Sequence, residues 1–171
     1  MRVCGAAIRV APVDIVFGSD RLDEIVTGAR EASISTHGEA LAIAAAAATA
    51  AAVSCAIDGA AASDIIAGAE EAARRVSEPF AHTVCSVHDD LRARSVLLPG
   101  DLAVRYFPDR PTTIVSLALA FATVLRSARE AILTAANVGG DSDSVASIAG
   151  GILGAAYRRR LRQTGPRRSV E

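Results

Sequence analysis

The residues best suited to chemistry lie near the C-terminal end of the sequence, in the run NVGGDSDS at positions 137–144. The run ends with two aspartates and two serines in alternation. Carboxylate and hydroxyl oxygens are hard ligands that suit Mg²⁺, Mn²⁺ or Ca²⁺. The preceding pair, Gly139 and Gly140, lets the backbone turn sharply and approach a ligand closely. The run is therefore the strongest candidate for a divalent-cation site.

The same residues also suit the start of an ordinary helix. Asp and Ser are preferred as N-caps and in the first turn, where their oxygens accept hydrogen bonds from free amides and favour the positive end of the helix dipole. A helix-like run of small residues, VASIAGGILGAAY, follows directly. Spacing alone therefore leaves two interpretations open, a cation site and a capped helix.

A wider comparison of motifs favours the first interpretation. The stretch NVGGDSDSVASIAGGILGA closely resembles the C-terminal metal-binding motif of the ADP-ribosylglycohydrolase family, a GGDTDT-like run before an AIAGA-like helix. Serines replace both threonines and keep the hydroxyls. Residues 5–12, GAAIRVAP, resemble the family's GNGAAMRVAP segment, and residues 35–37, STH, resemble its LTH segment. Three motifs in the family's order are more specific than one short motif.

The sequence also departs from the family pattern. Cys4 stands where the pattern has asparagine, Val3 where it has glycine and Ile8 where it has methionine. The resemblance covers only the C-terminal part of the family's domain. The earlier part, with a GDALG-like helix and a TDDT-like loop, supplies the other metal ligands and the catalytic acidic residue, and the sequence has no equivalent. The chain is thus expected to hold half of a two-metal site, and its catalytic residue stays unknown.

The resemblance implies an activity and a set of site residues. In the family, a pair of Mg²⁺ or Mn²⁺ ions binds the ribose hydroxyls of an ADP-ribosyl group while the bond at the anomeric carbon is hydrolysed. Matched residue by residue, it implies metal ligation by the carboxylates of Asp141 and Asp143 and by the hydroxyl of Ser144. The implied substrate contacts are His37, Gly139 and Gly140.

These implications give a first interpretation and two alternatives. The first is a metal-dependent hydrolase that removes ADP-ribose from a modified protein or small molecule, incomplete as an isolated chain. With only three ligands, an ion would keep most of its water. One alternative is a non-catalytic member that binds ADP-ribose or has a structural role, as in crystallin-like relatives. The other is a hydrolase of a different ribosyl compound. Helix faces left without the rest of the domain predict self-association or a second chain that completes the fold.

Composition sets the broad class. A chain of 171 residues supports one domain with a real core. The net charge of −1 does not favour nucleic acid as a partner. Its three cysteines are widely spaced and form no C-x-x-C pair, which argues against a zinc knuckle or a disulfide framework and fits the cytoplasm. The apolar run at 41–57 is rich in alanine and predicts a buried helix, so no membrane partner is expected.

Periodicity and helix signals predict an all-α fold, a single-domain multi-helix bundle over residues 1–157 with an arginine-rich, mobile tail at 158–171. Ser19 or Asp20 is expected to cap the first long helix, and Ser63 another. The region 78–110 reads as broken helices and loops. The expected helices cover residues 20–32, 39–57, 63–76, 111–125 and 127–138, and a last one starts within DSDS.

Three further expectations concern single residues. Ala146, Gly150 and Gly154 recur every four positions, so the last helix is expected to pack its small residues closely against the alanine-rich helix. Arg9 is expected to form a structural ion pair or to bind a carboxylate or phosphate. For His37 a capping or core role is as plausible as substrate binding. His82 and His88 lack metal-ligand spacing and are expected to face solvent.

Overall fold

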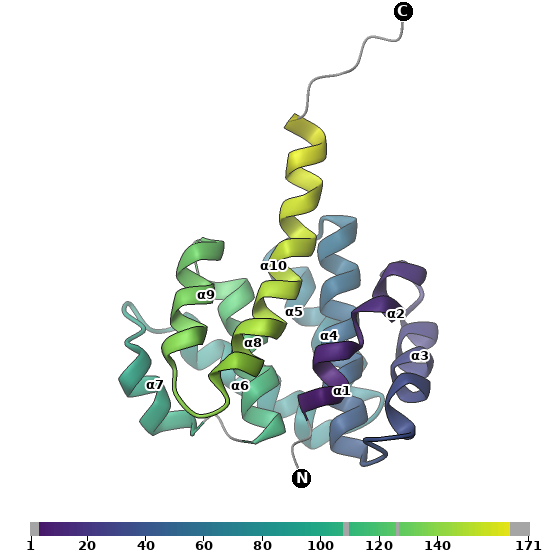
Figure 1. The fold of residues 1–171 in the computed structure, drawn as a ribbon, viewed down its shortest axis with the longest axis horizontal. Helices are drawn as coiled ribbons and strands as arrows, with labels where there is room; N and C mark the ends of the chain where they lie inside the picture. The colour runs from purple at the N-terminus through teal and green to yellow at the C-terminus, as the bar shows by residue number, and fades with distance from the viewer. Residues whose placement is uncertain (1–3, 108–109, 126, 165–171) are drawn as a thin grey trace, which may run out of the picture.

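The computed structural model describes residues 4–107, 110–125 and 127–164, and within these ranges every regular element is a helix, which confirms the all-α prediction. Figure 1 shows the helices packed as one bundle from which α10 projects. Their bounds are α1 (Cys4–Arg9), α2 (Ala11–Val16), α3 (Leu22–Ile34), α4 (Ala40–Asp58), α5 (Ala62–Arg74), α6 (Glu78–Arg92), α7 (Pro99–Tyr106), α8 (Pro111–Val124), α9 (Ala128–Asn137) and α10 (Ser142–Thr164).

The alanine-rich helix α4 forms the centre of the bundle. Helices α1, α3, α5, α8 and α10 all pack against it, so it has almost no polar face. Alanine suits this position because its small side chain lets neighbouring helices approach from every side. The helix is long and apolar enough to cross a membrane, but 83% of that apolar window is buried inside the protein. Gly59, with φ 79°, ends α4 in the left-handed conformation, close to the predicted helix end at residue 57.

Helix starts differ from the predicted caps in two places. The N-cap of α3 is Arg21 and that of α5 is Ala61, and neither side chain makes a capping hydrogen bond. By contrast, Ser127, the predicted first residue of a helix, is the N-cap of α9 and accepts a hydrogen bond from the Glu130 amide at 3.1 Å. The apolar faces of α3 and α5 pack against the bundle, and this packing stabilises both helices without a hydrogen-bonding side chain at the N-cap.

The region 78–110 is more regular than predicted. Helix α6 runs unbroken over its 15 residues, with Pro79 in its first turn. Proline lacks an amide hydrogen and has a fixed φ, and both properties are tolerated at a helix start. The prediction of a break was wrong because the proline begins a helix here and does not interrupt one. Pro99 begins α7 in the same way.

Helix α10 extends further than the predicted domain end at residue 157, because residues 158–164 of the predicted tail are helical. Residues 165–171 lie outside the described part of the chain, and the mobility of the tail stays a prediction. The helix buries one face over its first three turns. The side chains on this face are Val145, Ile148, Ala149 and Ile152.

The predicted close packing of the α10 glycines is wrong. Helix α10 does contact α4, but a Cβ atom added at Gly150, Gly151 or Gly154 would meet no described heavy atom within 4 Å. Branched aliphatic residues turn a different face of α10 toward the core. Close small-residue packing occurs instead between α4 and α5, where a Cβ at Gly68 would lie 2.9 Å from the Cys55 Sγ.

Replacing Gly154 by alanine is therefore expected to stabilise the protein by about 1 kcal/mol, because alanine removes the helix penalty of glycine and meets open space. The matched variant Gly68→Ala must displace the Cys55 thiol and is expected to destabilise. Chemical denaturation of both variants checks this. A loss of stability in Gly154→Ala would show that this face of α10 is covered in solution.

A charged cluster fastens α7 to α6. The carboxylate of Asp90 accepts hydrogen bonds from Arg94 at 3.0 and 3.3 Å and from Arg105 at 3.0 and 2.9 Å. The hydroxyl of Tyr106 also donates to it. Arg94 first, then Tyr106 and Arg105, lower the pKa of Asp90 from its ordinary 3.8 to about 2. These contacts join residues far apart in sequence and hold α7 beside α6.

The lowered pKa of Asp90 predicts a pH dependence of stability. A carboxylate whose pKa falls on folding stabilises the protein above its unfolded pKa, and this contribution is lost as pH falls through the folded value. Asp90→Asn should thus lower stability by about 1 kcal/mol at neutral pH. The difference from the parent protein should shrink between about pH 4 and pH 2. Urea denaturation across this range tests it, and a constant difference would contradict it.

Candidate functional site

The turn between α9 and α10 presents the aspartates. Gly139 and Gly140 both have positive φ, 80° and 56°, which glycine adopts without the strain of other residues. This turn brings the chain from the end of α9 into α10, where the Asp141 carbonyl accepts the Val145 amide at 3.2 Å. The paired glycines are thus explained by the backbone of the turn itself.

Among the described residues, two neutral donors hold the Asp141 carboxylate. The hydroxyl of Ser144 donates to its Oδ1 at 2.8 Å, within the first turn of α10. The thiol of Cys4, on α1, donates to its Oδ2 at 3.4 Å across 137 positions of sequence. Both oxygens therefore point to defined positions, and α1 and the start of α10 lie side by side (Figure 1).

The Cys4 thiol is protonated near neutral pH when no metal is bound. Burial is the largest cause of its raised pKa, and the hydrogen bond to Asp141 and its negative charge add to it, bringing the pKa to about 12. A protonated thiol donates a hydrogen bond and leaves the negative charge on the carboxylate. In this state the ligands that the cluster offers are the hard oxygens of Asp141 and Ser144.

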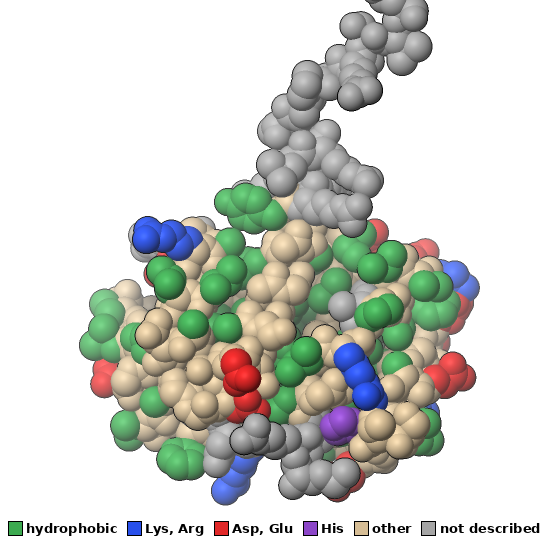
Figure 2. Space-filling view, viewed as in Figure 1, with side chains coloured by type: hydrophobic (Ala, Val, Ile, Leu, Met, Phe, Trp, Pro, Cys, Tyr) green, Lys and Arg blue, Asp and Glu red, His purple; other side chains and the backbone are tan. Residues whose placement is uncertain are grey.

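The three predicted ligands differ in exposure. Ser144 is buried, Asp141 is half-buried, and Asp143 is exposed. Figure 2 shows acidic side chains on the outer face over the first turn of α10. The exposed Asp143 therefore faces solvent beside a carboxylate that is fixed from the protein side.

The predicted substrate residue His37 lies against the same helix, α1. A Cβ atom on Gly5 would lie 3.1 Å from the His37 Cε1 and 3.2 Å from its Nε2, so the ring rests on the glycine. Cys4 and Gly5 are consecutive, and one contacts Asp141 while the other contacts His37. Helix α1 thereby places His37 and Asp141 on one side of the molecule.

The orientation of His37 is set by a short relay. The hydroxyl of Thr36 lies 2.7 Å from the His37 Nδ1, and Arg9 donates to the same hydroxyl. The Thr36 hydroxyl therefore links the Arg9 guanidinium to the His37 ring. Arg9 also donates to the Ala32 carbonyl at 3.1 Å. The prediction that Arg9 forms an ion pair was wrong for the described residues, because its hydrogen bonds go to a carbonyl and a hydroxyl.

The remaining predicted residues fall away from this site. His82 is exposed on α6, as predicted, whereas His88 is buried with 9% exposure, so the prediction that it faces solvent was wrong. Its position one turn before the end of α6 turns it toward α8, which sequence periodicity did not indicate. Cys4, Cys55 and Cys85 are free thiols. Sequence reasoning noted Cys4 as a departure from a pattern but missed its contact with Asp141.

The predicted ligands are of the type that a hard divalent cation prefers, but there are too few of them to complete its coordination. Two carboxylates and a hydroxyl are ligands that Mg²⁺ and Mn²⁺ accept. Among the described residues, no group of three or more His, Cys, Asp or Glu side chains is gathered closely enough to hold a metal ion. Water or another polypeptide segment would have to complete the coordination.

The sequence is similar to those of known proteins. A family model described as ADP-ribosylglycohydrolase matches residues 1–161, nearly the whole chain. An uncharacterised protein from Archaeoglobus fulgidus is 29% identical over 161 residues, which cover 89% of this chain and 48% of the relative. The chain thus spans about half the length of the curated relative that it matches.

Proposed function

The chain belongs to the ADP-ribosylglycohydrolase family, and from this premise we propose that it contributes to the metal-dependent hydrolysis of an ADP-ribosyl linkage. Family membership supports a hydrolase of the glycohydrolase type. The proposal adds the metal, Mg²⁺ or Mn²⁺, and the substrate class, an ADP-ribosylated protein or small molecule. The observation that carries it is the oxygen cluster at the start of α10, with Asp141 fixed between Ser144 and Cys4.

In this proposal Asp141, Asp143 and Ser144 hold the metal. When bound, a divalent ion would orient the ribose hydroxyls and stabilise negative charge that develops on oxygen. Cys4 positions the Asp141 carboxylate by donating to Oδ2. Ser144 has a second role, because its hydroxyl keeps lone pairs for a metal while its hydrogen fixes Oδ1.

The backbone and His37 would then contact the nucleotide. The positive-φ turn at Gly139 and Gly140 has no side chains that would keep a ligand away from the backbone. His37 would contact the substrate through its imidazole ring. Its ring is held by Thr36 and Gly5, so little ordering of this side chain would be required on binding.

The proposal assigns the missing ligands and the catalytic acidic residue to another polypeptide segment. A site with three ligands binds an ion weakly and leaves most of its water in place. A second chain, a second copy or a further part of a longer protein would complete the site. The exposed glycine face of α10 begins at Asp143 and offers open space to such a segment.

The test is a calorimetric titration of the protein with ADP-ribose, carried out once in the presence of Mg²⁺ and once with a chelator instead of Mg²⁺. We expect binding that requires Mg²⁺, together with slow or no release of ADP-ribose from an ADP-ribosylated substrate by this chain. Substitution of His37 by alanine should weaken ADP-ribose binding, and the same change at the exposed His82 should not. Absence of binding, or binding of equal strength with chelator, would refute the metal-dependent proposal.

A second candidate, a non-catalytic module that binds ADP-ribose, is favoured by the shortage of ligands among the described residues. The two candidate functions predict different results when the rest of the site is supplied. If the protein is supplied with the remaining half of a related enzyme and hydrolysis appears, the hydrolase proposal stands. If ADP-ribose binds but hydrolysis does not appear in any such combination, the module is the better description.

A further inference from the structure

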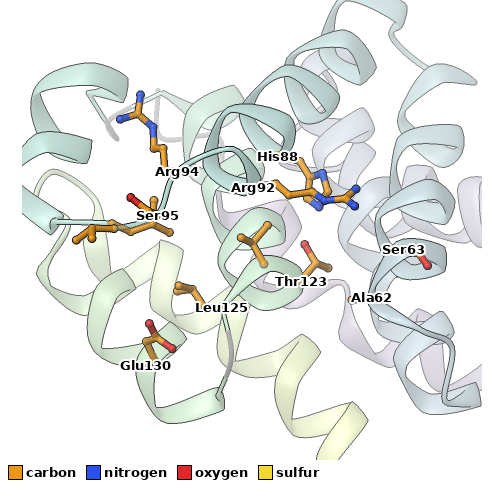
Figure 3. Close-up of a pocket in the computed structure, with 12 residues that line it drawn as sticks. Ala62, Ser63, His88, Arg92, Arg94, Ser95, Thr123, Leu125 and Glu130 are labelled. Carbon is orange, nitrogen blue, oxygen red and sulfur yellow. The ribbon is translucent and has the colours of Figure 1, made fainter.

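A cavity opens beside the first turn of α9, at the other end of this helix from Asp141. It has a volume of about 690 Å³, within the usual range for small-molecule sites. Its walls come from the start of α5, the end of α6 with the turn after it, the end of α8 and the first turn of α9 (Figure 3).

This cavity is separate from the proposed hydrolase site. Glu130 lines it from the first turn of α9, whereas Asp141 follows the last turn of the same helix. A helix of 10 residues is about 15 Å long. A ligand in the cavity would therefore occupy a different site from one held at Asp141.

One end of the cavity carries an uncompensated positive charge. Arg92 and Arg94 both line it, but Asp90 accepts two hydrogen bonds from Arg94 at 3.0 and 3.3 Å. Within the described part of the chain, no carboxylate forms an ion pair or hydrogen bond with Arg92. Arg92 is exposed, and an exposed guanidinium that lines a cavity without a carboxylate partner is suited to bind an anionic group through paired N–H donors.

His88 lies beside Arg92, one helical turn earlier on α6 (Figure 3). Its residue is 9% exposed, and its Nδ1 lies 3.5 Å from the Asp89 carboxylate on the outside of the helix. The two side chains form a nitrogen-rich wall that faces Thr123 of α8. Donors from this wall would meet one part of a ligand.

The start of α5 faces the same end of the cavity, where Ala62 and Ser63 line it. The N-cap residue Ala61 has a methyl side chain and makes no capping hydrogen bond. The Asp64 and Ile65 amides donate to the Ala61 carbonyl. This leaves the exposed Ala62 and Ser63 amides to an outside acceptor, and the positive end of the helix dipole favours an anion. Asp64 lies in the same turn but is not among the described residues that line the cavity.

The rest of the cavity is lined mainly by apolar and acidic side chains, with no unpaired positive charge among the described residues. Leu125 lies in its middle, and Glu130 and Ser95 lie toward the end away from Arg92 and Ser63 (Figure 3). The Glu130 carboxylate repels an anion from that end. A ligand with one anionic group and an apolar part would therefore enter in one orientation.

We propose that this cavity binds a small phosphate-bearing organic molecule, with its phosphate between Arg92 and the start of α5. A phosphate has enough acceptor oxygens to meet the guanidinium and the helix amides at once, whereas a carboxylate has fewer. The apolar part of the molecule packs on Leu125. The site would give the protein a second ligand, independent of metal and of ADP-ribose at Asp141.

The experiment is an NMR titration of the ¹⁵N-labelled protein with inorganic phosphate, without divalent metal. We expect saturable shifts of the Ala62 and Ser63 amides. Arg92→Gln should weaken this binding by about tenfold or more, the effect of losing a charge-assisted hydrogen bond. The matched control Arg30→Gln removes the same charge from an exposed position on α3 and should change the affinity by less than about twofold.

A second variant keeps the proposal testable if Arg92→Gln fails to fold. Ser95→Glu adds a negative charge to an exposed position in the cavity wall, outside any helix, and should also weaken phosphate binding. Acetate should bind more weakly than phosphate. The proposal is overturned by equal weakening in Arg92→Gln and Arg30→Gln, by saturable shifts confined to Gly139 and Gly140, by equal acetate affinity, or by no saturable shift.

Discussion

Replacing Asp143 by alanine is expected to weaken Mg²⁺ or Mn²⁺ binding by about 100-fold or more, because even partners of metal ligands cost about 10–100-fold when removed. Asp143 is exposed, so the change removes a carboxylate without opening the core. Asp141 is less suited to this test, because its carboxylate also joins α1 to α10 through Cys4. Calorimetric titration with either metal measures the effect.

Asp89→Ala is the matched control for this substitution. Its carboxylate is also largely exposed, with 68% of the side chain accessible, and lies on α6 away from the start of α10. Both variants remove one negative charge, so a general effect of net charge on cation binding would appear equally in both. Equal metal affinities for the two variants would contradict the assignment of Asp143 as a ligand and would favour a purely structural role for the DSDS run.

Replacing Phe121 by alanine is expected to lower the free energy of unfolding by about 3–5 kcal/mol. The side chain is fully buried in α8, which packs against α4, α6 and α10. Truncation removes apolar contacts and leaves a cavity among helices that cannot fully close it. Because domains are stable by only about 5–15 kcal/mol, this is a large share of the total. Denaturant titration with a circular dichroism signal measures it.

The control for this prediction is the same substitution at Phe107, which is 68% exposed after α7. There the change should alter stability by less than about 0.5 kcal/mol. Similar losses in the two variants would mean that α8 is not the core element that the structure describes. Phe121→Ala should also weaken metal binding at Asp141, because α8 supports α10, the helix that begins next to this residue. Phe107→Ala should leave metal binding unchanged.

The position of α1 links stability to the proposed site. Cys4 and Gly5 contact the Asp141 carboxylate and the His37 ring respectively. A side chain at Gly5 would push against His37, and a change at Cys4 would release one oxygen of Asp141. The short first helix, which sequence analysis treated only as part of a motif, thus positions residues from two distant parts of the chain.

Local sequence determined the helices and their approximate ends. The alanine-rich run made α4 a helix without a polar face, and Gly59 stopped it because glycine adopts the left-handed conformation without strain. Ser127 capped α9, and the DSDS run opened α10. These signals act within a few residues of the chain, so they can be recognised without tertiary structure. The family motifs were recognisable for the same reason, as short ordered runs.

Only the tertiary structure decided which face of each helix is buried and which distant residues meet. The glycines of α10 suggested close packing on α4, yet Val145, Ile148 and Ile152 took the buried face because larger aliphatic side chains gain more from leaving water. His88 was buried, and Cys4 met Asp141 across 137 positions. Such outcomes depend on the joint packing of several helices, and no local pattern encodes it.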